Sequence, residues 1–238
     1  MPNLLTTCGL FAGFYSIVAS IDGNFERAAL AIFAAMLFDG LDGRVARLTS
    51  TSSEFGKEFD SLSDMVSFGL APAIVMYQWG VQRLAEYGAL WGRLGWLAAF
   101  LYVAAAAFRL ARFNTNVGVQ DRRFFQGLAS PAAAAVVASM AWLTSHYGID
   151  GLKALVAGVT VTAISALLMM SRFAYLSFKD ISPGRRVRFA NLLLIPLVLM
   201  IIAIEPQLTV FALFLAYALS GPAVWLWRRR RRQDASHS

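Results

Sequence analysis

The sequence has a single cysteine, Cys8, among its 238 residues, and this excludes an internal disulfide. Charged residues are also scarce, at 15% of the chain, while apolar residues make up 58% even with glycine left out. Soluble domains have about 45–50% apolar residues with glycine included. The chain also lacks a low-complexity linker and an internal repeat. We therefore expect one integral membrane domain at 1–228, followed by a basic and polar tail at 229–238.

Uncharged runs recur along the chain, and most approach or exceed the roughly 18–20 residues that a membrane-spanning helix needs. They predict an all-α fold, a polytopic membrane bundle with about eight transmembrane helices. The expected helices lie at 4–22, 24–48, 55–80, 92–114, 127–147, 151–171, 187–204 and 207–227.

The net charge of +7 is interpreted as a sign of membrane topology rather than of nucleic-acid binding. If the amino terminus is cytoplasmic, only Arg27, Arg83, Arg93 and Lys153 of the 21 lysines and arginines fall outside. Because cytoplasmic loops are enriched in Lys and Arg, this asymmetry predicts that both termini are cytoplasmic. The run Arg228–Arg232 is interpreted as a stop-transfer anchor that is attracted to anionic headgroups.

Four aspartates interrupt the apolar background on either side of a turn near Thr51. Asp39 and Asp42 lie three residues apart before the turn, and Asp60 and Asp64 lie four residues apart after it. These spacings keep each pair on one helix face. Ionised carboxylates inside membrane segments cost several kcal/mol each, so the cluster needs compensating positive charge. We expect the two helices to form a hairpin in which the four carboxylates converge.

This cluster has the composition of a metal site. Four carboxylates match the charge of two divalent cations, and oxygen ligands suit Mg²⁺, Mn²⁺ or Ca²⁺ rather than zinc. Gly43, Ala46 and Gly56 lie nearby in the sequence and leave room for a ligand beside the metals. Two metals with space beside them suit a phosphate-bearing substrate. Proton relay, or ion pairing with Arg44 and Arg47, is the alternative role for these acids.

These residues resemble a known family. The pattern Asp39-x2-Asp42-Gly43-x2-Ala46-Arg47, then eight residues, then Gly56-x3-Asp60-x3-Asp64 matches the complete signature of the CDP-alcohol phosphotransferases. The resemblance implies that the four aspartates hold a dinuclear metal site and that Asp64 is also the general base. It further implies that Gly43, Ala46 and Gly56 accommodate the cytidine diphosphate part of the substrate, with Arg47 nearby. The implied reaction passes a phosphoryl group from a CDP-linked alcohol to an acceptor hydroxyl and releases CMP.

Other segments are similar to the integral-membrane phosphatidylserine synthase branch of that family. They are Pro2–Thr6, Asp60–Pro72, Arg109–Asn114, Phe125–Pro131 and Ser171–Lys179. The similarity implies that CDP-diacylglycerol and L-serine are the substrates, and that phosphatidylserine and CMP are the products. It also implies a homodimer among membrane lipids, in the inner membrane of a prokaryote. The distribution of basic residues predicts that the active site is on the cytoplasmic side, and no nucleic-acid partner is expected.

A zwitterionic acceptor such as serine needs a cation for its carboxylate. Arg109 and Arg112 share a helix face, and a guanidinium binds a carboxylate with two parallel hydrogen bonds. Asn114 offers an amide beside them, although the two arginines also fit a role as positive-inside anchors. Asn3 and Thr6 fit either contact with the nucleotide or capping of the first helix. His146 is interpreted as an interfacial residue.

Two other functions stay open at this point. A sibling phosphatidyltransferase would use glycerol 3-phosphate, an inositol phosphate or choline as acceptor, and the basic residues Arg109, Arg112, Arg122 and Arg123 could serve a sugar phosphate. A cation or proton transporter would be built around the same acids. It would need polar residues through both leaflets, whereas the far halves of the two aspartate-bearing helices are nearly all apolar.

Overall fold

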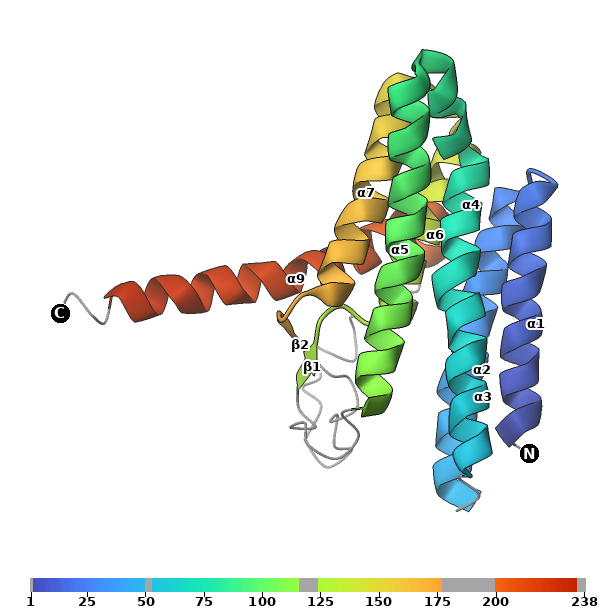
Figure 1. Ribbon diagram of the computed structural model, residues 1–238, viewed down its shortest axis with the longest axis vertical. Coiled ribbons are helices and arrows are strands. Elements are labelled where there is room, and N and C mark those ends of the chain that lie inside the picture. The colour runs from blue at the N-terminus through green and yellow to red at the C-terminus, as the bar shows by residue number, and fades with distance from the viewer. Residues whose placement is uncertain (1, 50–52, 116–123, 177–199, 235–238) are drawn as a thin grey trace.

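Helices α1 (Pro2–Ile21) and α2 (Phe25–Thr49) form an antiparallel hairpin at the amino terminus (Figure 1). Gly23 makes the turn with a φ of 74°, a conformation that glycine adopts without steric cost. The Asn24 side chain then accepts a hydrogen bond from the backbone N–H of Arg27 (3.1 Å) and caps α2. Small buried residues line the contact between the helices, and Ser16 Oγ donates to the Ala28 carbonyl (2.8 Å). The two helices therefore pack closely enough for their side chains to bond directly.

The computed structural model describes residues 2–49, 53–115, 124–176 and 200–234. Several expected features lie outside these ranges: the turn at Thr51, Arg122, Arg123 and most of the helix expected at 187–204. Residues 200–204, at the end of that expected helix, are helical. The backbone of Ala46, Arg47 and Arg228–Arg232 is described, whereas their side chains are not.

The next segment, Glu54–Tyr87, is a long helical stretch whose geometry changes along its length. Helix α3 (Glu54–Asp64) begins at Ser53, whose Oγ accepts from the Gly56 N–H at 3.0 Å. It continues as a π-helical turn, η1 (Met65–Leu70), as α4 (Ala71–Trp79), and as a 3₁₀ helix, η2 (Val81–Tyr87). The single helix expected at 55–80 is therefore present, but a π-helical turn directly after Asp64 interrupts it.

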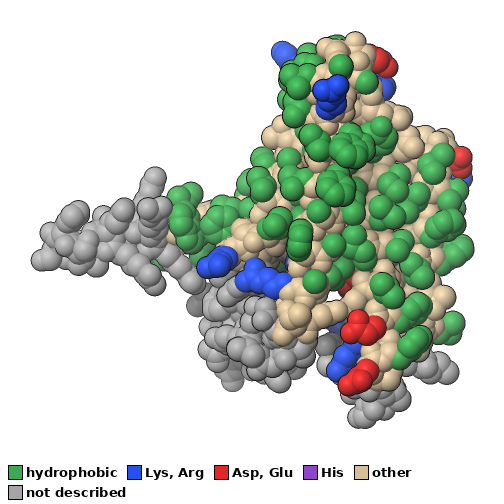
Figure 2. Space-filling model, in the orientation of Figure 1, with side chains coloured by type: hydrophobic (Ala, Val, Ile, Leu, Met, Phe, Trp, Pro, Cys, Tyr) green, Lys and Arg blue, Asp and Glu red, His purple; other side chains and the backbone are tan. Residues whose placement is uncertain are grey.

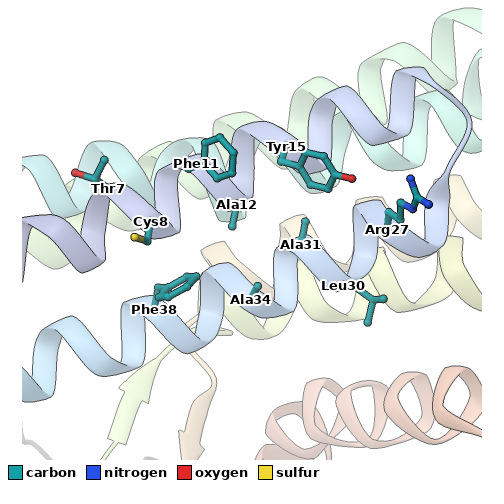
Figure 3. A pocket seen from close by; sticks show the side chains of 10 residues that line it. All are labelled: Thr7, Cys8, Phe11, Ala12, Tyr15, Arg27, Leu30, Ala31, Ala34 and Phe38. Atoms are coloured by element: carbon teal, nitrogen blue, oxygen red, sulfur yellow. The ribbon is translucent and has the colours of Figure 1, made fainter.

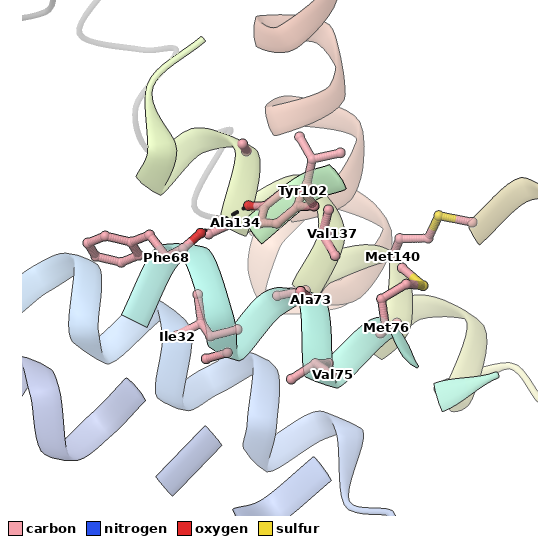
Figure 4. Packing of buried hydrophobic residues seen from close by; sticks show 14 of the residues in the cluster. Ile32, Phe68, Ala73, Val75, Met76, Tyr102, Ala134, Val137 and Met140 are labelled. Atoms are coloured by element: carbon pink, nitrogen blue, oxygen red, sulfur yellow. Dashed lines mark hydrogen bonds between the residues drawn. The ribbon is translucent and has the colours of Figure 1, made fainter. Parts of the chain in front are cut away.

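Helix α6 (Ser130–His146) lies in the interior of the bundle, where it contacts α2, α4 and α7 (Leu152–Met170), and α7 in turn packs against α5 (Ala89–Thr115). Nearly all of its side chains are buried, and its sequence is apolar around its whole circumference. This is the pattern of a helix that is surrounded by others. The core that packs around α6 includes Ile32, Phe68, Met76, Tyr102 and Val137 (Figure 4).

The all-α prediction misses one feature, a short antiparallel ribbon. Strands β1 (Phe124–Gln126) and β2 (Ala174–Leu176) pair with Phe125 opposite Tyr175. Three residues are too few for a strand to be recognised from alternating polarity, since that pattern needs about four to eight. The rest of the described chain is helical or lies in connecting segments.

The last helix, α9 (Pro206–Asp234), extends beyond the end expected at residue 227. Near its start, Gln207 Nε2 lies 3.3 Å from His146 Nδ1 at the end of α6. Further along, the Ala218 carbonyl accepts from the hydroxyl of Tyr175 in β2 (2.9 Å). Figure 1 shows that α9 is steeply inclined to the other helices and projects from the bundle. It therefore connects the α6–α7 end of the bundle to the ribbon.

Five helical segments of the described chain are long and apolar enough to cross a membrane. They are Asn3–Ile21, Glu54–Tyr87, Ala89–Thr115, Leu152–Met170 and Pro206–Trp227. Helix α6 has only 17 residues, and α2 carries several charges besides its aspartates. Figure 2 shows apolar side chains over the middle of one face, with charged groups gathered toward its ends. The protein is thus a helical membrane protein, and α2 brings two acidic side chains into its interior.

Candidate active site

The aspartates of α2 and α3 surround one small volume. Ligand oxygens of Asp39, Asp42 and Asp60 all lie within 4.8 Å of one another. Asp64, at the end of α3, lines the same two cavities as these three residues. The helical spacings therefore bring Asp39, Asp42 and Asp60 together and place Asp64 on the same cavities, while the roles of the four residues stay predictions.

The donor set of this cluster fits a hard divalent cation. Asp42 is only 5% exposed, and Asp39 and Asp60 are half-buried. Ionised carboxylates this close repel one another by several kcal/mol at the effective dielectric constant of about 20 that applies near protein sites. Nearby cations remove this repulsion, and carboxylate oxygens are the preferred ligands of Mg²⁺, Mn²⁺ and Ca²⁺. The chemistry of the residues present is thus compatible with a divalent-metal site.

Thr6 of α1 contacts this cluster directly. Its Oγ1 donates a 2.7 Å hydrogen bond to Asp42 Oδ2, and both side chains are buried. The sequence left Thr6 between a nucleotide contact and a helix cap, whereas the structure places it against a carboxylate of the cluster. The two residues are 36 positions apart, so local sequence contains no signal for their contact.

A cavity of about 460 Å³ opens beside the aspartates. One side is acidic, and the other side contains the Arg109 guanidinium and an apolar surface formed by Leu110, Phe113, Ala129 and Pro131. Gly43 borders this space, and a Cβ built on it would meet no other atom within 4 Å. The space beside Gly43 is thus open, and its use by a substrate stays a prediction.

Asn3 and Gly56 lie next to each other at the start of α1 and α3. A Cβ on Gly56 would lie 3.4 Å from Asn3 Oδ1 and 3.1 Å from Ser53 Oγ. Gly56 therefore permits a close approach between the first turns of the two helices. This contact adds a packing role to the substrate contact that the family signature implies for Gly56.

The three residues proposed to bind serine have different surroundings. Arg109 lines the cavity and donates from Nη1 to Ser130 Oγ at 2.6 Å. Asn114 instead bonds to α3, with its Nδ2 donating to Ser61 Oγ at 2.9 Å. Among the described residues that line the cavity, neither Arg112 nor Asn114 is present. The structure therefore brings only Arg109 of this group to the aspartates.

Ser130 is a site residue that sequence reasoning missed. It is fully buried in the first turn of α6, directly before Pro131, and it holds one end of the Arg109 guanidinium. Arg109 Nε is also buried, and it has no hydrogen-bond partner within the described chain. A Ser-Pro pair is common at helix starts. The sequence signal therefore indicated a helix start rather than a contact with Arg109.

A separate apolar groove of about 720 Å³ lies along the α1–α2 hairpin (Figure 3). Ala12, Ala31 and Ala34 line it together with the rings of Phe11 and Phe38. Thr7 lies at one end of the groove, and Tyr15 and Arg27 lie toward the other (Figure 3). Thr7 directly follows Thr6 in the sequence, and Phe38 directly precedes Asp39, so one end of this groove neighbours residues of the aspartate cluster along both helices.

Comparison with known proteins finds relatives whose names agree on one type of enzyme, a synthase of serine-containing phospholipids. The CDP-diacylglycerol–serine O-phosphatidyltransferase of Helicobacter pylori is 33% identical over 226 residues, which cover 95% of this chain and 91% of the relative. The enzyme of the same name from Mycobacterium tuberculosis is 30% identical over 234 residues, covering 93% and 77%. The archaetidylserine synthase of Methanothermobacter thermautotrophicus is 37% identical over 173 residues, covering 72% and 67%.

The family comparison covers the helices that build the site. The model of the CDP-alcohol phosphatidyltransferase family matches residues 1–171, which include α1 to α7 and all four aspartates. With the similarity to the relatives along most of the chain, this match is decisive. The chain belongs to the CDP-alcohol phosphatidyltransferase family.

Proposed function

We propose that this chain transfers the phosphatidyl group of CDP-diacylglycerol to the hydroxyl of L-serine, giving phosphatidylserine and CMP. The observation that carries the proposal is the convergence of three carboxylates within 4.8 Å beside a cavity that also contains Arg109. An acidic cluster suits metal-assisted chemistry on a pyrophosphate, and the arginine suits an acceptor with a carboxylate. The serine phosphatidyltransferases among the relatives support serine as the acceptor.

The proposed cofactors are two divalent cations, Mg²⁺ or Mn²⁺, with Ca²⁺ as a further candidate. Asp39, Asp42, Asp60 and Asp64 are the proposed ligands. When bound, such cations would neutralise charge on the pyrophosphate oxygens and on the leaving CMP. Thr6 orients Asp42 through its hydrogen bond, so that one carboxylate oxygen faces a fixed donor on α1. Hydrogen-bonded ligands of this kind are typical of metal sites.

In the proposed reaction, Asp64 accepts the proton of the serine hydroxyl. The serine oxygen then forms a bond to the phosphorus that carries the diacylglycerol, and the bond from that phosphorus to the CMP oxygen breaks. CMP leaves with the electron pair of the broken bond. Asp64 suits this role because it borders both the small cavity among the aspartates and the larger one beside Arg109. A general base must lie within hydrogen-bond reach of the proton that it takes.

Arg109 is the proposed partner of the serine carboxylate. Ser130 fixes its Nη1, and its buried Nε has no partner in the described chain, so that a donor remains for a ligand. A planar guanidinium can use such a donor together with a neighbouring N–H to bind both oxygens of a carboxylate. This contact does not require Asn114, which is bonded to Ser61.

The cytidine diphosphate part of the donor is proposed to lie on the α2 side of the larger cavity. Gly40, Gly43 and Arg44 border it there, and Cβ atoms at the two glycines would meet nothing within 4 Å. Ala46 and Arg47 follow on α2, and Gly56 on α3 completes the residues that the family signature implies. Asn3 lies beside Gly56 and is proposed as a further contact with the nucleotide. The small residues leave space for a ligand, and the arginines supply charge that attracts its phosphates.

The acyl chains of the donor require an apolar surface that begins near the aspartates. The groove between α1 and α2 meets this requirement, since its lining is almost entirely apolar and its Thr7 end adjoins the cluster in sequence. We propose that one acyl chain of CDP-diacylglycerol lies there. Each CH₂ group moved out of water contributes about 0.8 kcal/mol, so even a short buried stretch would favour binding of the lipid donor.

For the membrane arrangement we propose about eight spanning helices, both termini in the cytoplasm, and an active site that opens to the cytoplasm of a prokaryote. The distribution of arginines and lysines supports this proposal, since in this orientation only a few of them lie on the non-cytoplasmic side of the membrane. A homodimer is proposed from the family resemblance. Light scattering of the purified protein in detergent would measure its mass and test that assignment.

The decisive experiment measures CMP release from CDP-diacylglycerol by the purified protein, with each acceptor supplied separately. The acceptors are L-serine, glycerol 3-phosphate, an inositol phosphate and choline. We expect release that depends on serine and on Mg²⁺ or Mn²⁺. Activity with glycerol 3-phosphate but not serine would assign the chain to a sibling activity. If CMP is released with none of these acceptors, the proposed reaction is wrong.

A further inference from the structure

Pro72, just after η1, explains why this turn is π-helical. In a regular α-helix the Phe68 carbonyl would accept from the N–H of residue 72. Proline has no N–H, and its ring clashes with the carbonyl four residues earlier. The chain avoids this clash by widening into a π-helix, in which the Ala71 N–H bonds to the Val66 carbonyl. The Phe68 carbonyl thus lacks the N–H at position 72 that a regular α-helix would offer, and it is open to a donor from elsewhere.

Tyr102 of α5 supplies that donor. Its hydroxyl donates a 3.1 Å hydrogen bond to the Phe68 carbonyl, and the residue is fully buried (Figure 4). Packing on the same side is close, because a Cβ built on Gly69 would lie 3.2 Å from Ala106 Cβ. Helix α5 thus both fills the space beside η1 and satisfies its carbonyl.

Helix α1 holds the opposite side of the same turn. Ser67 Oγ donates to the Gly9 carbonyl at 3.1 Å, and Ser63 Oγ donates to the Thr6 carbonyl at 3.2 Å. A Cβ on Gly13 would overlap Ser67, so the two backbones approach closely here. The turn after Asp64 is therefore fixed between two helices, with one hydrogen bond from α5 and one to α1, and Ser63 bonds the end of α3 to α1 directly before Asp64.

The geometry of η1 determines where Asp64 points. Each residue of an α-helix turns the chain by about 100°, so a π-helical turn shifts the rotational phase of the segments on its two sides by about that angle. Helix α4 is fixed by its buried residues Ala71, Ala73, Val75 and Met76. A return of η1 to regular α-helix would consequently rotate α3, and with it Asp60 and Asp64.

We propose that Tyr102 is a positioning residue for the active site: its hydroxyl holds η1 in the π-helical geometry that directs Asp64 toward Asp39, Asp42 and Asp60. Tyr102 lies seven residues, or about two turns, before Arg109 on the same face of α5. One helix face therefore supplies both the support for the aspartates and the cation of the cavity. This inference rests on the proposed function of the site.

The test compares two Tyr→Phe variants that each remove one buried hydroxyl. Tyr102→Phe removes the bond to Phe68, whereas Tyr175→Phe removes an equivalent bond to the Ala218 carbonyl (2.9 Å) in the β2–α9 contact. Burial raises the pKa of Tyr175 to about 12, so its hydroxyl is a donor at the pH of the assay. Both variants should lose similar thermal stability, because each loses one hydrogen bond between a hydroxyl and a backbone carbonyl.

Activity should separate the two variants. We expect kcat of Tyr102→Phe to fall about ten- to hundredfold, the range expected for a misplacement of about 1 Å, with little change in KM for either substrate. Tyr175→Phe should keep the native kcat. Equal kcat values for Tyr102→Phe and the native protein would overturn the proposal.

Metal binding gives a readout that does not depend on activity. The rise in Tm on adding Mn²⁺ should require a several-fold higher Mn²⁺ concentration in Tyr102→Phe, and the native concentration in Tyr175→Phe. If the native protein fails to release CMP but shows this difference, the proposed function is wrong and the positioning role stands. If the protein is active and the Mn²⁺ response is the same in all three proteins, the positioning role is wrong.

A second variant keeps the test valid if Tyr102→Phe does not fold. Pro72→Ala restores an N–H for the Phe68 carbonyl and removes the ring clash, which favours a regular α-helix through η1. It should therefore retain or raise the Tm while kcat falls about as much as in Tyr102→Phe. A purely structural role would make activity follow stability, and full activity in Pro72→Ala would contradict the proposal.

Discussion

Thr6 donates a 2.7 Å hydrogen bond from Oγ1 to Oδ2 of Asp42, and this bond joins α1 to the acidic face of α2. Asp42 is 5% exposed, so water offers its carboxylate few alternative donors. The Thr6 hydroxyl therefore fixes the position of one carboxylate oxygen of Asp42, and the position of the other oxygen is then set by α2. Fixed orientation matters at a site where three carboxylates lie within 4.8 Å, because small rotations change the distances between their oxygens.

Replacement of Thr6 by Val should weaken the site without removing any of the aspartates. The variant keeps the shape of the side chain but loses the donor, and we expect a loss of about 10–100-fold in metal affinity or activity, typical of residues that orient metal ligands. The measurement is CMP release as a function of Mn²⁺ concentration. Thr160→Val, on an exposed position of α7 where Oγ1 bonds to its own helix, is the matched control and should behave as the native protein. An unchanged metal dependence in Thr6→Val would show that the bond has no role in orienting Asp42.

Much of the fold could be predicted from apolar runs. The helices expected at 4–22 and 151–171 are observed as α1 (Pro2–Ile21) and α7 (Leu152–Met170), since uninterrupted apolar length decides where a helix enters and leaves a membrane. The aspartate cluster could also be predicted, because its two pairs have helical spacing and lie on either side of one turn. Both predictions depend on information that is local in the sequence.

What escaped prediction depends on contacts between distant residues. Thr6 and Asp42 are 36 positions apart, and Tyr102 is 34 positions from Phe68. Pro72 is visible in the sequence and favours a local irregularity, but its widening into a π-helix depends on the donor that Tyr102 supplies from α5. Likewise, Arg109 lines the cavity and Asn114 bonds to Ser61, and this difference between the two residues arises only from tertiary packing.

Substitution of the aspartates should distinguish their two proposed roles. Asp39→Asn, Asp42→Asn and Asp60→Asn each remove one ligand charge, and each should abolish turnover at ordinary metal concentrations. Asp64→Asn should stay inactive at saturating metal, with a loss of about 10²–10⁴-fold, because it also removes the proton acceptor. The measurement is CMP release at rising Mg²⁺ or Mn²⁺ after treatment with a chelator.

The control for these variants is Asp150→Asn. Asp150 is exposed and pairs with Arg83 at 2.9 Å, away from the aspartate cluster, so its substitution should leave turnover unchanged. A near-normal rate of Asp64→Asn at high metal would show that Asp64 is a ligand only. Full activity after complete chelation would contradict the metal site itself.

Membrane topology can be tested with single cysteines in a Cys8→Ser background. The basic residues predict that Ser50, between α2 and α3, is cytoplasmic and that Ile149, between α6 and α7, is on the opposite side. Ile149 is 45% exposed and should accept a label. An impermeant thiol reagent applied to intact cells should therefore label Ile149→Cys but not Ser50→Cys, and lysed cells should show labelling of both. Labelling of both sites from the same side would refute the proposed orientation.

The groove between α1 and α2 can be tested by filling it. Ala31 and Ala34 line the groove, and a Trp at either position would occupy the space proposed for an acyl chain. We expect Ala34→Trp to raise KM for CDP-diacylglycerol several-fold, with little change in KM for serine, because the change affects binding of the lipid donor only. Leu167→Trp places the same ring on a 59% exposed position of α7 and should leave both constants unchanged. Identical KM values for Ala34→Trp and the native protein would place the acyl chain elsewhere.

The choice of acceptor should depend on Arg109. Arg109→Lys keeps the positive charge but loses the planar pair of donors, so KM for serine should rise while KM for CDP-diacylglycerol changes much less. Arg112→Lys makes the same change three residues away, at a residue that does not line the described part of the cavity, and should have a smaller effect on KM for serine. Steady-state kinetics with each substrate varied in turn measure both constants. Equal effects of the two substitutions would contradict the assignment of the serine carboxylate to Arg109.

The same contact can be tested from the side of the acceptor. Serinol keeps the amine and a hydroxyl of serine but lacks the carboxylate, so it cannot pair with Arg109. The native protein should use it more weakly by about 2–3 kcal/mol, since a buried charge-assisted pair is lost. In Arg109→Lys the preference for serine over serinol should shrink, because the guanidinium that distinguishes them is gone, whereas Arg112→Lys should keep the native preference. If the native protein uses serinol and serine equally well, carboxylate recognition is not how this site selects its acceptor.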